Sequence, residues 1–567
     1  MKRTLNVLLG VFSCICIAVV TFATGLPTKN KIVSAATLSE FISTGNEPSE
    51  YAYSFMVVGD TQIVNCYDPE SYPLIYDYIL DNVESKKVKH VFGLGDITDK
   101  DLDEEWARAK DQITRMDGIV SYSLIRGNHD MGEFFNASGF TDEQSPFDET
   151  FGEDSSYANQ YVLNYKGTRN TAHEFSAGNF NYLVIALDFG PTDDVLEWAN
   201  TVVEAYPNHN VIVTTHGYLN ADGTFLEKGE NNHPASNWAN GGLTRNNGDQ
   251  IWDKFVKKHA NISMVLCGHV VSDDIVTWQQ KGINGNTVTQ MLINPQGMDA
   301  DSKIGTTGMV ATFYVSESGD VINVEYYSTK KAKYYSTDNQ FTFTANVVEK
   351  GNPYVNVSIF GNGTATIDGD RIARKPLTAD SVEIGFLPSL NYIIKKVMLN
   401  GVDITSQIKD GKYTLLSTNS NQVFFVEYAE RMKYLLIEQN LLYKGKIIYS
   451  FPQPCAEFYE GATFSVSVEP NEGYVLKKIT LNGVELKANS DNRYEIVIAP
   501  QDNILAVDYE ENENQASTQQ PEEDLQSSGC RGNKKGCNAS LPVGLGGTVV
   551  CTLSMLLRKR RKNNDVI

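Results

Sequence analysis

Six short apolar segments of this chain each end, within three residues, in an Asp, an Asn or a His. The segments and the residues that follow them are 55–58 before Asp60, 91–94 before Asp96, 123–125 before Asn128, His129 and Asp130, 182–187 before Asp188, 211–213 before His216, and 264–266 before His269. Buried strands of an open α/β sheet end in loops that carry ligand-binding groups. We therefore expect these polar side chains to meet at the carboxyl ends of the strands.

Helix-like segments lie between the apolar runs. Apolar residues recur at three- and four-residue spacing in residues 72–83, 104–116, 195–205 and 250–258. Strands that alternate with amphipathic helices are typical of a layered α/β architecture, in which helices cover the faces of the sheets. The sequence therefore predicts an α/β fold for its N-terminal part.

The polar residues at the strand ends form a mixed set of metal ligands. They offer carboxylates (Asp60, Asp96), an amide (Asn128) and imidazoles (His216, His269), a mixture that suits Mn, Fe or Zn better than Ca. A carboxylate can bridge two cations, and such a pair activates water while neutralising a phosphoryl oxygen. Asp96 is the candidate bridge.

The composition limits the classes of partner. The chain has 567 residues, 41% of them hydrophobic, and a formal net charge of -22. Its length suggests about four structural units. Because an acidic surface repels phosphate backbones, nucleic-acid binding is not expected. No sequence feature fixes the oligomeric state.

The N-terminus predicts export. Lys2 and Arg3 precede an apolar stretch at 7–20, and small residues follow at Ala23 and at residues 35–36. This pattern is typical of a signal peptide, which we assign to residues 1–36, with cleavage at either group of small residues. An uncleaved membrane anchor is the alternative.

The C-terminus predicts a membrane anchor. Residues 541–557 are apolar and precede a basic cluster at 558–562. As a helix, this segment would rise roughly 25 Å, near the lower limit for a span. The basic tail, residues 558–567, would then stay cytoplasmic, and residues 511–540, which are poor in apolar side chains, would form a disordered stalk. A buried helix is the alternative for residues 541–557.

An internal repeat precedes the predicted stalk. Residues 392–403 recur at 474–485, and both copies contain an Asn-Gly pair, at Asn400 and Asn482. Alternating apolar residues around Asn-Gly predict a hairpin. These segments resemble divergent internalin-type B repeats of bacterial surface proteins, so we expect two small all-β repeat domains at 340–430 and 431–510. Such repeats either hold the rest of the chain away from the cell envelope, which we favour, or bind a surface themselves.

Five short motifs appear in order, and together they resemble those of the calcineurin-like metallophosphoesterases over about residues 50–335. The motifs are Gly59-Asp60-x-Gln62, Gly95-Asp96-x-x-Asp99, Gly127-Asn128-His129-Asp130, Thr215-His216 and Gly268-His269. The resemblance implies a four-layer sandwich of two β-sheets flanked by helices, with two divalent metal ions at the strand ends and a phosphoester as substrate.

The resemblance also implies residue roles. Asp60, Gln62 and Asp96 would bind the first metal, and Asp96 would also serve the second. The remaining ligands of the second metal would be Asn128, His216 and His269. His129 would be the general acid that protonates the leaving group, with Asp99 orienting it. Metal-activated water would attack phosphorus directly.

Two positions depart from the family pattern. The family commonly has His where this chain has Gln62 and where it has Val271. A Gln carbonyl oxygen can ligate a hard cation, whereas Val has no ligand atom. The first metal site is therefore expected to be weaker, unless Asp273 or Asp274 substitutes.

Three hypotheses for the function follow. The first is a surface-anchored, metal-dependent phosphoesterase. The second is an extracellular binding protein with a catalytically impaired phosphoesterase domain, and the third is an adhesin in which the repeats act. Retention of both His129 and Asp99 favours the first, because an inactive site would need no acid and orienting pair.

Overall fold

The computed structural model describes residues 30–31, 41–131, 145–231, 235–238, 244–296, 305–451 and 457–512. Outside these ranges lie the predicted signal peptide except residues 30–31, the stalk beyond residue 512, the anchor at 541–557 and the basic tail. Among the helices within the described ranges, none has the length and apolar character needed to cross a membrane.

The first sheet contains the strands that precede His216 and His269. Its central strands β12, β10, β9 and β8 are parallel, and the outer pairs β11–β12 and β7–β8 are antiparallel. In spatial order the strands are β1 (Asn30–Lys31), β11 (Ser272–Lys281), β12 (Thr287–Asn294), β10 (Ile262–Cys267), β9 (Asn210–Thr215), β8 (Phe180–Leu187), β7 (Asn170–Ala177) and β6 (Leu163–Tyr165).

The second sheet contains the strands that precede Asp60, Asp96 and Asn128. Its strands β3, β4 and β5 are parallel, and β13 is antiparallel to β3. The spatial order is β2 (Phe41–Ile42), β15 (Lys333–Tyr335), β14 (Val321–Ser328), β13 (Met309–Val315), β3 (Tyr53–Val58), β4 (Val88–Gly93) and β5 (Ser121–Ser123), and β16 (Phe341–Thr344) pairs with β14. The domain boundary expected between residues 335 and 340 therefore lies before β16, which still belongs to this sheet.

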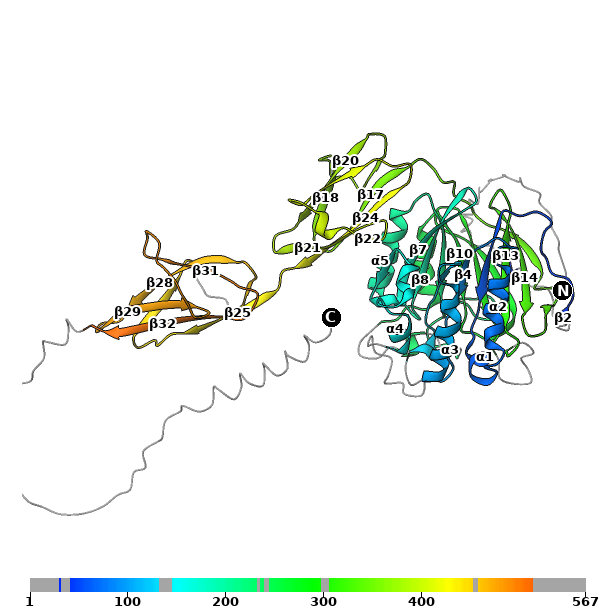
Figure 1. Cartoon of the computed structure of the whole chain (residues 1–567), viewed down its shortest axis with the longest axis horizontal. Coiled ribbons are helices and arrows are strands. Elements are labelled where there is room, and N and C mark those ends of the chain that lie inside the picture. The colour runs from blue at the N-terminus through cyan, green and yellow to red at the C-terminus, as the bar shows by residue number, and fades with distance from the viewer. Residues whose placement is uncertain are drawn as a thin grey trace, which may run out of the picture. The chain divides into compact units, whose positions relative to one another are not determined.

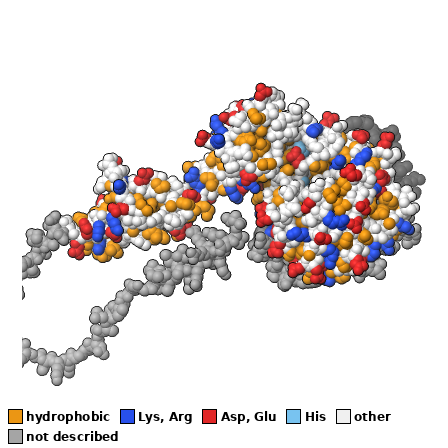
Figure 2. Space-filling model, in the orientation of Figure 1, with side chains coloured by type: hydrophobic (Ala, Val, Ile, Leu, Met, Phe, Trp, Pro, Cys, Tyr) orange, Lys and Arg blue, Asp and Glu red, His pale blue; other side chains and the backbone are white. Residues whose placement is uncertain are grey.

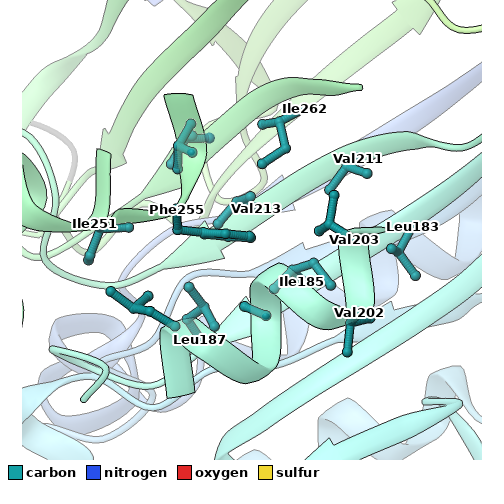
Figure 3. Packing of buried hydrophobic residues seen from close by; sticks show 14 of the residues in the cluster. Leu183, Ile185, Leu187, Val202, Val203, Val211, Val213, Ile251, Phe255 and Ile262 are labelled. Carbon is teal, nitrogen blue, oxygen red and sulfur yellow. The ribbon is translucent and has the colours of Figure 1, made fainter. Parts of the chain in front are cut away.

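The two sheets pack face to face, because residues of both contribute to one apolar core. Phe55 of β3, Phe92 of β4 and Val184 of β8 are buried in it. Successive side chains of a strand point to opposite faces. Accordingly, Leu183 and Ile185 of β8 face the other way, toward helices that cover the first sheet (Figure 3).

Six α-helices lie in the described part of this α/β region. Figure 1 labels α1 to α5 beside the strands of the two sheets. They are α1 (Gln62–Tyr67), α2 (Tyr72–Asn82), α3 (Asp103–Ile113), α4 (Pro146–Phe151), α5 (Asp193–Ala205) and α6 (Gly248–Lys254). Apolar residues of α2 and α3 pack on the outer face of the second sheet, and those of α5 and α6 on the outer face of the first. The resulting order of helix, sheet, sheet and helix confirms the predicted α/β architecture.

The helix predictions agree with the structure closely. The segments expected at 72–83, 104–116 and 195–205 correspond to α2, to α3 with the 3₁₀ turn η1 (Thr114–Met116), and to α5. The segment expected at 250–258 differs, because Phe255 separates α6 from the 3₁₀ turn η6 (Val256–Lys258). The Phe255 side chain, between α6 and η6, is buried in the apolar core.

The rest of the described chain is almost entirely strand and forms two β-units of identical strand order. The first unit pairs the sheet β19-β17-β24-β21-β22 with β18-β20-β23, and the second pairs β27-β25-β32-β29-β30 with β26-β28-β31. The strands of the first unit are β17 (Tyr354–Phe360), β18 (Gly363–Ile367), β19 (Arg374–Pro376), β20 (Ser381–Pro388), β21 (Tyr392–Leu399), β22 (Val402–Asp403), β23 (Lys412–Leu416) and β24 (Gln422–Glu430). Those of the second are β25 (Lys433–Gln439), β26 (Gly445–Tyr449), β27 (Glu457–Tyr459), β28 (Thr463–Pro470), β29 (Tyr474–Leu481), β30 (Val484–Glu485), β31 (Tyr494–Val497) and β32 (Asn503–Glu511).

The Asn-Gly hairpins predicted from the repeat are present in both units. Leu399 pairs with Val402 across Asn400 and Gly401, and Leu481 pairs with Val484 in the second unit. Each Asn and Gly of the two turns has a positive φ, as a type I′ hairpin requires.

The chain divides into two compact units at residue 432. The first β-unit belongs with the α/β region and packs at the end of α5. There, the Tyr354 hydroxyl donates to the main-chain oxygen of Ala205 (3.1 Å), and Arg374 Nη2 donates to that of Glu204 (2.7 Å). The second β-unit, from Lys433 on, has its own small apolar core.

Candidate metal centre

The carboxyl ends of β3, β4, β5, β9 and β10 bring five of the predicted ligands together. Asp60 follows β3, Asp96 follows β4 and Asn128 follows β5, while His216 and His269 follow the neighbouring strands β9 and β10. All five residues are buried. The side chains therefore meet where the two sheets converge, as the pattern of apolar segments predicted.

Four of these side chains point their ligand atoms at one place. The Asn128 Oδ1 atom is 2.7 Å from His269 Nδ1 and 3.1 Å from His216 Nε2, and His216 Nε2 is 3.2 Å from Asp96 Oδ1. The ligand atoms of Asp96, His216 and His269 all lie within 4.8 Å of one another. A carboxylate, an amide oxygen and two imidazoles in this arrangement can hold one transition-metal ion.

The main chain fixes the tautomer of His216. Its Nδ1–H donates to the main-chain oxygen of Leu94 at 2.7 Å, so Nε2 is the atom that faces Asp96 and Asn128. A hydrogen bond of this kind commonly orients a metal-binding imidazole. Burial would lower the pKa of His216, but the carboxylates of Asp96 and Asp60 raise it to about 9. A proton on Nε2 thus takes the place that a cation would fill.

A second group of ligand atoms lies beside Asp60. Asp60 Oδ2 accepts a hydrogen bond from the main-chain N–H of His269 (3.0 Å), and Gln62 Nε2 donates to Asp96 Oδ2 (2.9 Å). Among the described residues, Asp60 Oδ1 and Gln62 Oε1 are buried and have no hydrogen-bond partner. Burial, with repulsion from Asp96, raises the pKa of Asp60. A cation bound to either of these oxygens would satisfy it.

Asp274, one of the two substitutes considered for the missing imidazole, is engaged elsewhere. The Val271 side chain has no ligand atom, and the residue is 49% exposed. Asp274 Oδ1 accepts a hydrogen bond from Asn339 Nδ2 at 2.8 Å. Instead, Gln62 Nε2 also donates to Oε1 of Gln296, a residue that the sequence motifs do not include.

His129 lies at the edge of the centre, in the short turn η2 (Asn128–Asp130). Its Nδ1–H donates to the main-chain oxygen of Asp99 at 2.8 Å, while the Asp99 carboxylate is 3.6 Å away. The structure therefore places the two residues together, with a main-chain carbonyl as the hydrogen-bond acceptor. The His129 side chain is 17% exposed, which leaves it accessible to a substrate.

Asp130 is a supporting residue that the family motif contains but to which the sequence assigned no role. Its carboxylate accepts hydrogen bonds from the main-chain N–H groups of Ile97 (3.0 Å), Thr98 (3.0 Å) and Gly127 (2.8 Å). These bonds tie the loop after β4 to the loop after β5. Burial and the nearby Asp96 raise the pKa of Asp130 to about 7.

Asp188 supports the centre from outside. Its two carboxylate oxygens accept hydrogen bonds from Nε (2.7 Å) and Nη2 (2.8 Å) of the buried Arg126, whose chain position is two residues before Asn128. Arg245, from the long segment after β9, donates to the main-chain oxygen of Phe189 (2.9 Å) and is buried. The Phe189 ring packs against both His216 and His269. Arg245 therefore binds the main chain of a residue that holds these two imidazoles in place.

Two motif glycines allow the ligands to approach the main chain. A Cβ atom at Gly127 would overlap Asp96 Oδ1, and one at Gly268 would overlap Asp60 Oδ1. The ligands Asp96 and His269 have φ values of 46° and 74°, which cost a non-glycine residue about 1–3 kcal/mol. Strain of this kind is typical of a functional site that the surrounding fold holds in place.

Residues 53–273 match the family model for calcineurin-like phosphoesterases. The chain thus contains a calcineurin-like phosphoesterase domain there, as its motifs indicated. Uncharacterized protein YvnB of Bacillus subtilis (strain 168) is 29% identical over 306 residues, which cover 51% of this chain and 21% of YvnB. The chain therefore spans about a fifth of the length of the curated relative that it matches.

Two solved structures are similar to part of the chain. GAP50, the anchor in the inner membrane complex of Plasmodium, is 13% identical, with 53% of this chain and 90% of that chain covered and a TM-score of 0.32. Purple acid phosphatase PPD1 from yellow lupin (Lupinus luteus) seeds is 14% identical, with 53% and 55% covered and a TM-score of 0.33.

Proposed function

We propose that the calcineurin-like phosphoesterase domain hydrolyses phosphate mono- or diesters with the help of two divalent metal ions, with Mn, Fe or Zn as the candidates. The convergence of Asp96, Asn128, His216 and His269 on one point carries this proposal. The two unsatisfied oxygens beside it, on Asp60 and Gln62, support a second ion. A pair of cations supplies an activated water and offsets the charge on the phosphoryl oxygens.

Residues of the chain would bind the ions and protonate the leaving group. Asp96 extends Oδ1 toward His216 and Oδ2 toward Gln62, so this one carboxylate would hold both ions. His129 holds a proton on Nδ1 against the Asp99 carbonyl, which leaves Nε2 to deliver a proton to the leaving oxygen. General acid catalysis of this kind contributes typically 10²- to 10⁴-fold. No covalent bond to the protein is required.

The test is hydrolysis by the purified full-length chain with and without Asp96. Wild-type protein, stripped of metal and reloaded with Mn, Fe or Zn, should cleave p-nitrophenyl phosphate or bis-p-nitrophenyl phosphate. Asp96→Ala should lose both activity and most of its bound metal, because it removes the shared ligand. Asp77→Ala, on the exposed face of α2, is the matched control and should retain both. Metal-loaded wild type that cleaves neither ester would refute the proposal.

A binding protein or adhesin with an impaired catalytic domain is the second candidate function. The observation that favours it is Val271, which offers no ligand where the family commonly has a His. Metal content separates the two candidates. About two ions per wild-type chain supports the enzyme, and none supports the binding protein.

We further propose that the protein is exported and held at the cell surface by residues 541–557, with the phosphoesterase domain outside. The N-terminal signal-like segment and the C-terminal apolar segment with its basic tail support this proposal. A chain truncated before Ser540 should appear in the medium. If it stayed bound to cells to the same extent as the full chain, the anchor assignment would be wrong.

The two β-units are proposed to be repeats of the internalin type that space the catalytic domain from the envelope. Their identical strand order and matching Asn-Gly hairpins support a common origin. On the face seen in Figure 2, acidic, basic and apolar side chains are intermingled over the molecule, which suits a solvated spacer. Deletion of residues 433–512 should leave hydrolysis unchanged but alter access to envelope-bound substrate.

A further inference from the structure

Gln296 follows a strand end in the same way as the metal ligands do. Strand β12 is parallel to β10, so both strands end at the same edge of the first sheet. His269 lies two residues beyond β10, and Gln296 lies two residues beyond β12. The topology therefore delivers Gln296 to the metal centre, although no motif of the sequence includes it.

Its hydrogen bonds decide which atom of the amide faces the centre. Gln296 Nε2 donates to the main-chain oxygen of His269 at 3.1 Å, and the Gln296 main-chain N–H donates to Asn294 Oδ1 at 2.9 Å. Because the carbonyl of His269 can only accept, the nitrogen of the amide is committed to it. The Oε1 atom is consequently presented to Gln62, whose Nε2 also contacts Asp96 Oδ2.

The atom that Gln296 Oε1 faces is Gln62 Nε2, on a residue expected to bind the first metal, and the same nitrogen donates to Asp96 Oδ2. Two further oxygens of the expected ligands, Asp60 Oδ1 and Gln62 Oε1, are buried without hydrogen-bond partners among the described residues. Gly59 brings the end of β12 close to this loop, since a Cβ atom there would overlap the main-chain oxygen of Ile293 and lie 2.8 Å from Pro295 Cδ. Asp96 Oδ2 and Gln296 Oε1, which come from two different loops, thus accept from the same Gln62 N–H group, and a cation in the place of that donor would be bound by both oxygens.

We propose that Gln296 Oε1 is a ligand of the first metal and takes the place of the imidazole that Val271 cannot supply. The proposal rests on the two-metal function proposed above. It makes the first site an all-oxygen site, whereas the second site has two imidazoles. Oxygen ligands favour Mg and Mn, and imidazoles favour Zn. The two sites should therefore prefer different ions.

The experiment is a titration of the metal-stripped, full-length protein with Mn²⁺, read by calorimetry and by the EPR spectrum of bound Mn²⁺. Wild type should bind two ions and show the spectrum of a coupled pair. Gln296→Leu, which keeps the volume but removes the oxygen, should weaken the first site roughly 10- to 100-fold or more and leave the second unchanged. At one bound equivalent, its spectrum should be that of an isolated ion.

Gln296→Glu distinguishes a ligand from a hydrogen-bonding residue. Glutamate keeps an oxygen for the metal but cannot donate to the His269 carbonyl as the amide does. If Gln296 is a ligand, this variant should bind the first ion at least as tightly as wild type. If its only role is the hydrogen bond, Gln296→Glu should be as weak as Gln296→Leu, and the proposal would be overturned.

Gln279→Leu is the matched control. Gln279, on β11, is also half-buried, and it pairs with Thr289 of β12. Thr289 lies five residues before the end of β12, so Gln279 is about 17 Å from that end of the strand. It should bind both ions as wild type does. Unchanged affinities in Gln296→Leu would refute the ligand role and leave the proposed function standing. A wild type without bound metal would refute both, and the hydrolysis assay on the same sample would show this separately.

Discussion

His129 and Asp99 are joined by a main-chain contact: the imidazole Nδ1–H donates to the Asp99 carbonyl oxygen at 2.8 Å, while the nearer carboxylate oxygen is 3.6 Å away. A distance of 3.6 Å is too long for a hydrogen bond. The orientation of the imidazole is therefore set by the backbone of the loop after β4. Because the Asp99 carboxylate does not hold the imidazole, replacing His129 and replacing Asp99 should have different effects on turnover.

Replacing His129 by Ala should slow turnover roughly 10²- to 10⁴-fold while leaving bound metal in place, because the residue donates a proton and binds no ion. The loss should be smaller for aryl phosphates, whose leaving groups need little protonation. Steady-state rates with a matched pair of alkyl and aryl esters measure the difference. Equal losses for both esters would remove His129 from the role of the acid.

Replacing Asp99 by Ala should reduce turnover by less than about tenfold, or about 1.4 kcal/mol in the barrier. The main-chain acceptor remains after the substitution, so the imidazole keeps its hydrogen bond. The same rate measurements check this, with His129→Ala as the reference. A loss as large as that of His129→Ala would mean that the carboxylate, and not the carbonyl, orients the imidazole during turnover.

Metal binding should release a proton from His216 at pH 7. The carboxylates of Asp96 and Asp60 outweigh burial and raise the pKa of His216 to about 9, so Nε2 is protonated in the metal-free protein below that pH. The cation must displace this proton. Apparent affinity at the second site should consequently rise about tenfold per pH unit up to pH 9 and then level off.

Calorimetry in two buffers of different ionisation enthalpy measures the released protons directly. The heat of Mn²⁺ binding at pH 7 should differ between the buffers, and the difference should shrink at a pH above 9. Binding heats that agree in both buffers at pH 7 would show that His216 is already neutral.

Breaking the buried pair between Arg126 and Asp188 should destabilise the domain. Asp188→Asn leaves the guanidinium of Arg126 buried without its counter-charge, which costs about 3–5 kcal/mol. Asp77→Asn, which breaks the exposed pair with Arg115, is the control and should cost no more than about 1 kcal/mol. Denaturant unfolding of the two variants measures both values. Equal losses would mean that the buried pair contributes no more than a surface one.

The sequence predicted the part of the site that depends on strand pattern. Apolar segments before Asp60, Asp96 and His216 mark strands, and strands of an α/β sheet end in loops that carry ligands, so the place of these side chains at strand ends follows from periodicity. The meeting of the two sheet edges does not follow from it, because Asp60 and Asp96 belong to one sheet and His216 to the other. Gln296 also follows a strand, whose residues 288–293 are apolar except for Thr289 and Gln290. The strand-end pattern does not reveal it, because those two polar residues interrupt the apolar segment and because the pattern is defined by Asp, Asn and His alone.

The features that sequence could not predict depend on the path of the backbone. The contact of His129 with the Asp99 carbonyl requires the conformation of two loops, and a main-chain oxygen carries no residue identity. The pairing of Asp188 with Arg126 joins residues 62 positions apart through tertiary packing alone. Likewise, β16 extends the second sheet beyond the expected boundary because Phe343 and Phe341 are paired with β14.

The most direct test of a two-metal phosphoesterase is one titration that follows bound metal and hydrolysis together. Metal-stripped, full-length protein receives Mn²⁺ in steps, and each step is assayed for bound ions and for cleavage of bis-p-nitrophenyl phosphate and p-nitrophenyl phosphate. Cleavage of at least one ester should rise as the second ion binds and reach its maximum at about two ions per chain. Protein that binds no Mn²⁺, or full cleavage with one ion bound, would contradict the two-metal mechanism.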